Sequence, residues 1–243
     1  MSNKISTGSF DLNKWLYGGY EKDVITMLAG APGTGKTNFA ILAACSQAKK
    51  EKKAIFIDTE GGFSSERVKQ IVGDENLDKI LENILVLSPV NFSEQKKSFE
   101  KLLQELKNEQ VGLIVVDGMA MLYRLELGDA VKSKEDDNIK EVNREVARQM
   151  RVLAEIARKK NIPVLITNQV YESFVPEEEW KKGVRGQLNI VGGDLLKYWS
   201  KCIIVLDNYN GKRKAFLRKH RSLQEKELHF DIRNKGVFRR GWI

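Results

Sequence analysis

Residues 30–37 have the composition of a phosphate-binding loop. They match the pattern G-x-x-x-x-G-K-[ST] at every fixed position. In this pattern glycines let backbone N–H groups approach nucleotide phosphates, the lysine reaches the β and γ oxygens, and the last hydroxyl ligates Mg²⁺. The sequence therefore predicts a site for ATP and Mg²⁺, with Lys36 also a catalytic candidate. The residues expected to hold the nucleotide are Gly30, Ala31, Pro32, Gly33, Thr34, Gly35, Lys36, Thr37 and Asn38.

The residues on either side of this loop have the order that phosphate binding requires. Residues 24–28 are apolar and predict a short buried strand, whereas residues 38–49 are rich in Ala and Leu and predict a helix. The alternative interpretation is a flexible glycine turn. The strand–loop–helix order favours phosphate binding.

Two carboxylates stand at the ends of apolar runs that predict buried strands. Glu60 follows the run at residues 54–58, and Asp117 ends the run at residues 111–117. In open α/β sheets ligands bind at the carboxyl ends of strands, so both acids are expected beside the phosphates. Asp117 and Thr37 would position Mg²⁺, and Glu60 could orient or deprotonate an attacking water. By spacing alone, a solvated loop acid is an equally good interpretation of Glu60.

Two amides follow a third apolar run. Residues 163–167 predict a buried strand, and Asn168 and Gln169 come directly after it. Such a strand would deliver both amides to the edge that carries Glu60 and Asp117, where Gln169 could sense the γ-phosphate. Taken alone, Asn-Gln is equally consistent with a turn.

The positive charge of the chain is concentrated near its end. The net charge is +8, and residues 195–243 hold thirteen basic and four acidic residues, against 28 basic and 29 acidic residues before them. Segregated positive charge is typical of proteins that bind a polyanion, whereas a solvated Lys-rich surface is the alternative. We expect sequence-independent DNA binding carried by backbone charge. The residues expected to contact DNA are Arg218, Lys219, His220 and Arg221. His220 could stack on a base or contact a phosphate, but its position between two permanent cations favours a neutral, structural histidine at pH 7.

The composition limits the classes of protein to which this chain can belong. A chain of 243 residues with 42% hydrophobic and 30% charged residues predicts one globular domain over residues 1–243. It holds no apolar run long enough to span a membrane and no apolar signal core, so we expect a cytoplasmic location and no membrane contact. Two cysteines lie far apart and only two histidines are present, which argues against a zinc site.

The order of apolar segments predicts an α/β fold. Helices alternate with strands before residue 170, including a long helix from Ile139 to near residue 160, and only strands follow the loop at residues 171–193. This order predicts a mostly parallel central sheet flanked by helices, with antiparallel C-terminal strands. Residues 119–138 are expected to form a polar loop. The C-terminal strands are expected at residues 202–206, 208–211, 215–218, 227–231 and 237–239.

Several segments, in their order along the chain, resemble the ATPase core of the RecA/RadA recombinases. They are residues 5–8, the phosphate loop, residues 58–61, the strand that ends at Asp117, and residues 166–170. The resemblance covers almost the whole chain and is strongest to an archaeal branch that consists essentially of the core. It implies a RecA-type P-loop ATPase fold and a role in DNA repair and recombination.

The resemblance also implies roles for individual residues. Glu60 matches the glutamate that activates water, and Gln169 matches the amide that reports the γ-phosphate to a DNA-binding loop. Arg67 matches an arginine that stacks on adenine. Residues 126–138 and 171–191 match the two DNA-binding loops.

The chain departs from full-length recombinases in three respects. We see no helical domain or Phe-x-x-Ala polymerisation segment before the core, no Arg-Gln-Gln stretch after the first loop, and three consecutive glutamates in the second loop. We therefore expect an ATP- and DNA-binding accessory protein with weak, slow ATP hydrolysis and no strand exchange of its own. A RadA-type recombinase is the expected partner, and a homodimer is one state that the sequence leaves open.

Two alternatives remain at this point. In one, the chain is a nucleotide-gated module that binds DNA or a recombinase and hydrolyses ATP only incidentally. In the other, it is a regulatory ATPase of the KaiC-like type that acts on proteins, so its DNA affinity would be weak and independent of the C-terminal charge.

Overall fold

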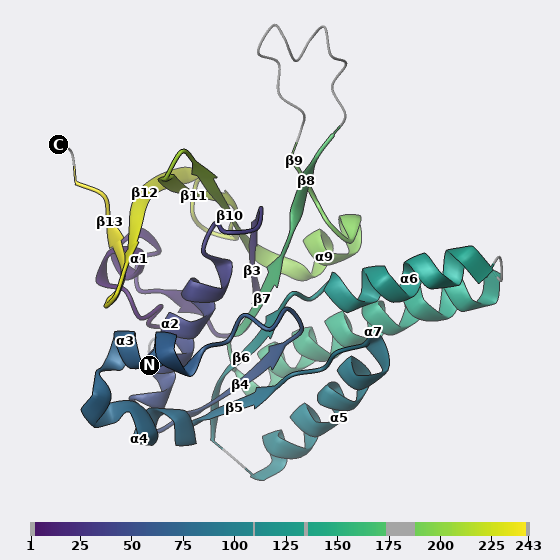
Figure 1. Cartoon of the computed structure of the whole chain (residues 1–243), viewed down its shortest axis with the longest axis horizontal. Helices are drawn as coiled ribbons and strands as arrows, with labels where there is room; N and C mark the ends of the chain where they lie inside the picture. The colour runs from purple at the N-terminus through teal and green to yellow at the C-terminus, as the bar shows by residue number, and fades with distance from the viewer. Residues whose placement is uncertain (1–2, 109, 134–135, 174–187, 242–243) are drawn as a thin grey trace, which may run out of the picture.

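A nine-stranded sheet forms the centre of the molecule (Figure 1). The computed structural model describes residues 3–108, 110–133, 136–173 and 188–241. The strand order is β13-β12-β11-β10-β3-β7-β6-β4-β5; the strands from β10 to β5 in this order are parallel, and β11, β12 and β13 are antiparallel. The bounds are β3 Ile25–Gly30, β4 Lys53–Asp58, β5 Ile84–Leu87, β6 Val111–Asp117, β7 Val164–Asn168, β10 Ser200–Tyr209, β11 Lys212–Lys219, β12 Lys226–Arg233 and β13 Gly236–Arg239.

Helices cover both faces of the parallel strands, which explains why those strands are almost continuously apolar. One face packs against α1 (Phe10–Trp15), α2 (Lys36–Ala48), α3 (Ser65–Val72) and α4 (Leu77–Glu82). The other packs against α5 (Phe92–Asn108), α6 (Met121–Ser133), α7 (Asp136–Lys160) and α9 (Gly193–Trp199). A 3-10 turn spans Asp74–Asn76, and two small sheets pair β1 (Lys4–Ile5) with β2 (Tyr20–Glu21) and β8 (Val170–Glu172) with β9 (Leu188–Ile190). The architecture confirms the predicted fold class.

The prediction of a polar loop at residues 119–138 is wrong. Most of this segment is helix α6, and α7 begins three residues earlier than predicted (Figure 1). Leu122 and Ala130 are buried, but Leu125 and Val131 are more than half exposed. Because its apolar residues point in several directions, α6 lacks the single stripe by which an amphipathic helix is recognised.

The C-terminal segments also differ from expectation. The strand predicted at residues 208–211 is the end of β10 followed by a tight turn, in which Asn210 has φ 50° and Gly211 has φ 75°. An Asn-Gly pair of this conformation joins antiparallel strands in a two-residue hairpin. The loop expected at residues 171–193 contributes strands β8 and β9, and α9 begins at its last residue; its residues 174–187 lie outside the described residues.

No helix in the described part of the chain combines the length and apolarity that crossing a membrane requires.

Candidate nucleotide and nucleic-acid sites

The phosphate loop joins β3 to α2, as its sequence predicts. β3 ends at Gly30 and α2 begins at Lys36. Gly35 has φ 107°, and a Cβ atom there would lie 2.5 Å from the Cδ1 atom of Ile232. A Cβ at Gly30 would lie 2.5 Å from the carbonyl oxygen of Leu206. Glycine is therefore required at both ends of the loop by close contacts with β12 and β10.

The Lys36 side chain lies against the loop itself. Its Nζ atom donates to the carbonyl oxygens of Gly30 at 2.9 Å and Ala31 at 3.1 Å, and the residue is 6% exposed. Burial lowers the pKa of the ammonium group, while Glu60 and Asp117 oppose that shift. The loop thus holds a largely desolvated cation beside backbone that can approach an anion.

Asp117 is a buried carboxylate held by two threonine hydroxyl groups. Thr37 Oγ1 donates to one carboxylate oxygen at 2.7 Å, and Thr167 Oγ1 donates to the other at 2.5 Å. Burial raises the pKa of Asp117, whereas these two hydrogen bonds oppose the shift. Oxygen atoms from Thr37 and Asp117 are therefore adjacent, and oxygen is the ligand atom that Mg²⁺ prefers.

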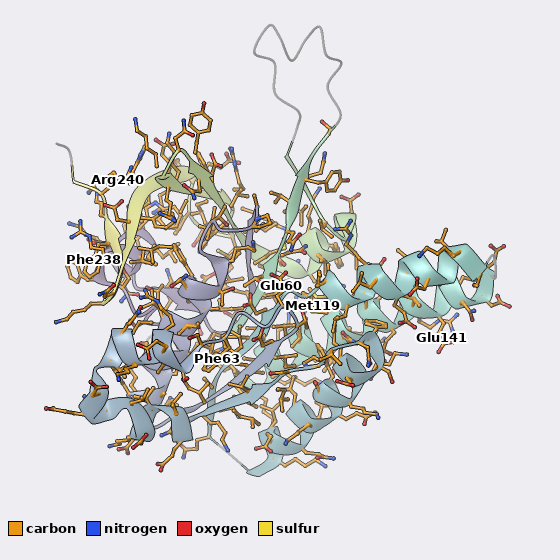
Figure 2. All side chains as sticks on the ribbon, viewed as in Figure 1. Glu60, Phe63, Met119, Glu141, Phe238 and Arg240 are labelled. Atoms are coloured by element: carbon orange, nitrogen blue, oxygen red, sulfur yellow. The ribbon has the colours of Figure 1, made fainter. Side chains whose placement is uncertain are left out.

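Glu60 and Gln169 follow the carboxyl ends of β4 and β7 and lie close together. Gln169 Nε2 donates to Glu60 Oε1 at 3.3 Å, although the residues are far apart in the sequence. The turn that carries Glu60 is fixed by Asp58, whose carboxylate accepts the N–H groups of Glu60 at 3.3 Å and Phe63 at 2.9 Å. Glu60 lies near Met119 in the middle of the molecule (Figure 2).

Arg67 joins α3 to the C-terminal strands. Its Nε atom donates to Asn38 Oδ1 at 2.7 Å, and its Nη1 atom donates to Gln70 Oε1 at 2.8 Å. Its Nη1 and Nη2 atoms also donate to the carbonyl oxygens of Asn234 at 3.0 Å and Arg233 at 2.9 Å. Because these bonds use the edge of the guanidinium plane, its flat faces can stack on a planar group. The contribution of the turn between β12 and β13 was missed from the sequence, where nothing connects it to Arg67.

The four residues expected to contact DNA divide into two pairs. Arg218 and Lys219 are exposed. Arg218 lies 3.6 Å from a carboxylate oxygen of Glu225, with both side chains more than half exposed. Lys219 Nζ donates to the carbonyl oxygen of Lys197 at 2.8 Å. Both cations can thus still reach an anion from solvent.

His220 and Arg221 instead bind other parts of the chain. The His220 side chain is 2% exposed, its Nδ1 accepts the N–H groups of Ser222 and Leu223, and its Nε2 lies 3.5 Å from Glu21 Oε2. Arg221 donates to both carboxylate oxygens of Asp23 at 2.7 Å and to Glu21 at 3.0 Å. His220 and Arg221 are thus held by residues from the start of the chain, although Arg221 is itself exposed, and DNA contact stays a prediction for all four residues.

Two aromatic side chains accompany the exposed cations and were not singled out in the sequence. Tyr198 is 67% exposed, and Lys201 Nζ lies 5.0 Å from the centre of its ring. Phe216 has the guanidinium of Arg218 at 5.0 Å and Lys214 Nζ at 5.9 Å from its ring centre. The only available signal was the spacing of Tyr198 and Phe216 among lysines and arginines. We call Lys197, Lys201, Lys214, Arg218 and Lys219 the basic surface.

Comparison with known proteins is consistent with this geometry. The family model described as Rad51 matches residues 2–239. DNA repair and recombination protein RadB of Methanobrevibacter smithii is 39% identical over 242 residues, covering 97% of this chain and 96% of the relative. The RadB of Methanocaldococcus jannaschii is 40% identical over 226 residues, covering 93% and 98%.

A solved structure shows the same similarity in three dimensions. The crystal structure of the RadB recombinase superposes with a TM-score of 0.75 at 32% sequence identity, over 96% of this chain and 98% of that chain. A RecA/Rad51 ATPase fold in general implies nucleotide and Mg²⁺ binding, and the recombinase family implies DNA binding. The chain belongs to the RecA/Rad51 family of DNA recombination and repair proteins.

Proposed function

We propose that this chain is an ATP- and DNA-binding accessory protein of homologous recombination that assists a RadA-type recombinase. In this proposal it hydrolyses ATP slowly and performs no strand exchange of its own. The observation that carries it is the convergence of Lys36, the Thr37–Asp117 pair and the Glu60–Gln169 pair at one edge of the sheet.

The phosphate loop and Asp117 would bind the nucleotide and its metal ion. Backbone N–H groups of residues 30–37 and the Lys36 ammonium would face the phosphates, and Arg67 would stack on the base. Thr37 and Asp117 would hold Mg²⁺, which neutralises phosphate charge when bound. The described residues contain no cluster of three or more His, Cys, Asp or Glu that could hold a metal ion by themselves. The remaining ligands would be phosphate oxygens of the nucleotide and water molecules.

Slow hydrolysis follows from an incomplete set of catalytic groups. Glu60 is exposed at the edge of the site and would orient or deprotonate water, with Gln169 holding its carboxylate. Fast phosphoryl transfer commonly uses a second cation to stabilise the charge of the transition state. Within the described ranges, Lys36 is the cationic side chain that hydrogen-bonds the loop backbone. In this proposal a neighbouring molecule supplies the second cation.

DNA would bind at the basic surface. The pKa of Lys219 is lowered by burial and, to a smaller extent, by the positive charge of Lys201. Two like charges held close together favour the arrival of an anion, and a phosphate group would relieve their repulsion. Tyr198 and Phe216 offer flat apolar faces beside these cations, which suits nucleic acid.

A nucleotide-gated binding module is the second candidate, and one contact favours it. Gln169 precedes β8 directly, and its carbonyl oxygen accepts the N–H of Val191 at 3.0 Å, just after β9. A γ-phosphate that displaced the like-charged Glu60 carboxylate would release the Gln169 amide at the base of this strand pair. ATP could then change DNA or recombinase affinity without hydrolysis.

Strand exchange by a RadA-type recombinase, with and without the chain, tests the proposal. We expect the chain alone to exchange no strands and the wild type to stimulate the recombinase. Lys36→Ala should remove the stimulation, whereas Lys49→Ala, at the other end of the same helix, should leave it intact. Loss with Glu60→Gln supports the hydrolysing accessory protein, and full stimulation with it supports the gated module. Strand exchange by the chain alone, or no effect on the recombinase, would contradict the proposal.

A further inference from the structure

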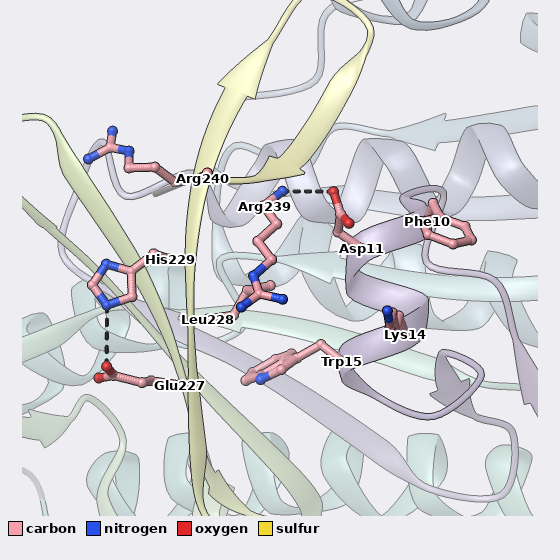
Figure 3. A pocket seen from close by; sticks show the side chains of 10 residues that line it. Phe10, Asp11, Lys14, Trp15, Glu227, Leu228, His229, Arg239 and Arg240 are labelled. Atoms are coloured by element: carbon pink, nitrogen blue, oxygen red, sulfur yellow. Dashed lines mark hydrogen bonds and ion pairs between the residues drawn. The ribbon is translucent and has the colours of Figure 1, made fainter. Parts of the chain in front are cut away.

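A groove of about 560 Å³ lies between α1 and the strand pair β12–β13, and its lining residues do not include those assigned above to ATP (Figure 3). Helix α1 forms one wall, and the two strands with the residues after them form the other. Its lining side chains are Phe10, Asp11, Lys14, Trp15, Glu227, Leu228, His229, Arg239 and Arg240.

The groove holds more basic side chains than acidic side chains without a partner. Asp11 accepts the backbone N–H of Arg239 at 2.8 Å. Glu227 lies between Lys214 at 3.7 Å and His229 at 3.2 Å, so both acids already have partners. In contrast, within the part of the chain that the structure describes, neither the Lys14 ammonium group nor the Arg239 guanidinium forms an ion pair.

The guanidinium of Arg239 points into the groove between Leu228 and Trp15 (Figure 3). Arg240 is different, because Asp231 accepts from its Nε atom at 2.9 Å. Arg239 is thus held by its backbone alone, and its charge is left for a ligand. A guanidinium can bind a carboxylate through two parallel hydrogen bonds.

The groove also offers apolar surface. Phe10 is 80% exposed, which is high for a large aromatic side chain, and it stands on the rim. Trp15 and Leu228 lie deeper and are 9% and 6% exposed. An exposed phenylalanine beside a half-enclosed apolar floor is typical of a protein contact.

We propose that this groove is a docking site for an acidic segment of a partner protein. A carboxylate of that segment binds Arg239 and Lys14, and a neighbouring apolar side chain packs against Phe10 and Trp15. Nucleic acid fits less well, because a phosphate backbone needs a continuous track of cations. Here Asp11 and Glu227 interrupt the track, while the groove holds two uncompensated cations.

The position of the groove places such a partner close to the proposed ATP site. β12 contributes Leu228 to the groove and Ile232 to the contact with Gly35. The turn between β12 and β13 accepts two hydrogen bonds from Arg67. The docked segment and the phosphate loop therefore contact the same pair of strands.

Binding of short labelled peptides to the full chain tests the proposal. The probe is Glu-Asp-Phe-Glu-Asp, with Lys-Arg-Phe-Lys-Arg and Glu-Asp-Ala-Glu-Asp as matched peptides and oligo(dT) as a competitor. Fluorescence anisotropy gives the affinity, and the indole N–H resonance of Trp15, assigned with Trp15→Phe, reports the location. We expect saturable binding of the acidic aromatic peptide, weaker binding of the alanine peptide and none of the basic one.

Two exposed positions supply the variants, because substitutions of exposed side chains have small effects on stability. Arg239→Gln and Phe10→Ala should each weaken the acidic peptide about tenfold, or about 1.4 kcal/mol. Arg144→Gln, which removes an exposed arginine on α7, should not change its affinity. Absence of saturable binding, equal loss in Arg144→Gln, or a Trp15 shift with oligo(dT) but not with the peptide would overturn the proposal.

Discussion

The nucleotide edge and the basic surface hold their charges in opposite ways. At the edge, Lys36 and Asp117 are buried, and hydrogen bonds to backbone or threonine groups fix both. On the basic surface, Arg218 and Lys219 are exposed to water and ions. Because water screens exposed charges and not buried ones, single substitutions should have large effects at the edge and small, additive effects on the surface.

Lys36→Ala should give the largest effect. It removes a cation that donates to two carbonyl oxygens of the loop, and charge-assisted hydrogen bonds contribute about 1.5–3 kcal/mol each. We expect affinity for Mg-ATP to fall by about 100-fold or more in calorimetry. Lys49→Ala, on the same helix, is the control. Wild-type affinity in Lys36→Ala would show that the two regions do not differ as described.

Glu60→Gln should come next and should separate binding from turnover. The amide keeps the size of the side chain but cannot take a proton from water. General base catalysis contributes about 10²–10⁴-fold, so we expect ATP turnover to fall at least about 100-fold while Mg-ATP affinity stays within about threefold. Glu66→Gln, an exposed acid on α3, should leave both unchanged. Unaltered turnover in Glu60→Gln would remove Glu60 from the catalytic set.

Arg221→Ala should affect stability rather than DNA. The substitution leaves the Glu21 side chain, only 8% exposed, without its guanidinium partner. We expect the free energy of unfolding to drop by about 1–2 kcal/mol in urea titrations. Arg218→Ala breaks an exposed pair and should cost less than about 0.5 kcal/mol. Equal losses in the free energy of unfolding would mean that the buried Glu21 carboxylate does not make its pair with Arg221 more important than the pair of Arg218 with Glu225.

Lys219→Ala should affect DNA binding rather than stability. It should weaken binding to single-stranded DNA only a few-fold and lower the salt slope of log K by about 0.7, with stability unchanged. Lys97→Ala, an exposed lysine on α5, controls for net charge. A salt slope that is identical in the wild type and Lys219→Ala would place the DNA site elsewhere.

The smallest effect concerns pH and His220. Burial lowers its pKa, whereas Glu21 opposes the shift and Lys4, Arg221 and Lys226 add to it. The unfolded chain, with a histidine pKa of about 6.5, then binds the proton more readily, so this contribution to stability is complete above that pH and declines below it. His220→Asn should flatten the loss of stability between pH 7.5 and 5.5, measured as the free energy of unfolding at each pH. An unchanged slope would mean that His220 is not the titrating group.

The strands and the helix that flank the phosphate loop could be predicted from the sequence because their determinants are local. The run at residues 111–117 is both the predicted strand and β6, and the phosphate loop sits between the predicted strand and helix. The order of helices and strands also indicated a parallel sheet with an antiparallel end. These features depend on residues next to each other in the chain.

The features that escaped prediction depend on distant partners. Glu21, near the start of the chain, lies beside His220 and Arg221, and Arg67 is held by the carbonyl oxygens of residues 233 and 234. A count of basic residues cannot tell which of them the fold neutralises. Helix α6 escaped for another reason, since its exposed Leu125 and Val131 disrupt the apolar stripe.

The position of β3 in the sheet bears on how the chain is made. β3 carries the phosphate loop, yet both of its neighbours, β7 and β10, are synthesised long after it. A nascent chain therefore leaves one edge of this apolar strand unpaired until β10 has left the ribosome, a state that favours aggregation. A chain that ended before residue 232 would lose the Ile232 side chain that contacts Gly35 and the carbonyl oxygens that hold Arg67, so such a truncation should disturb the phosphate loop.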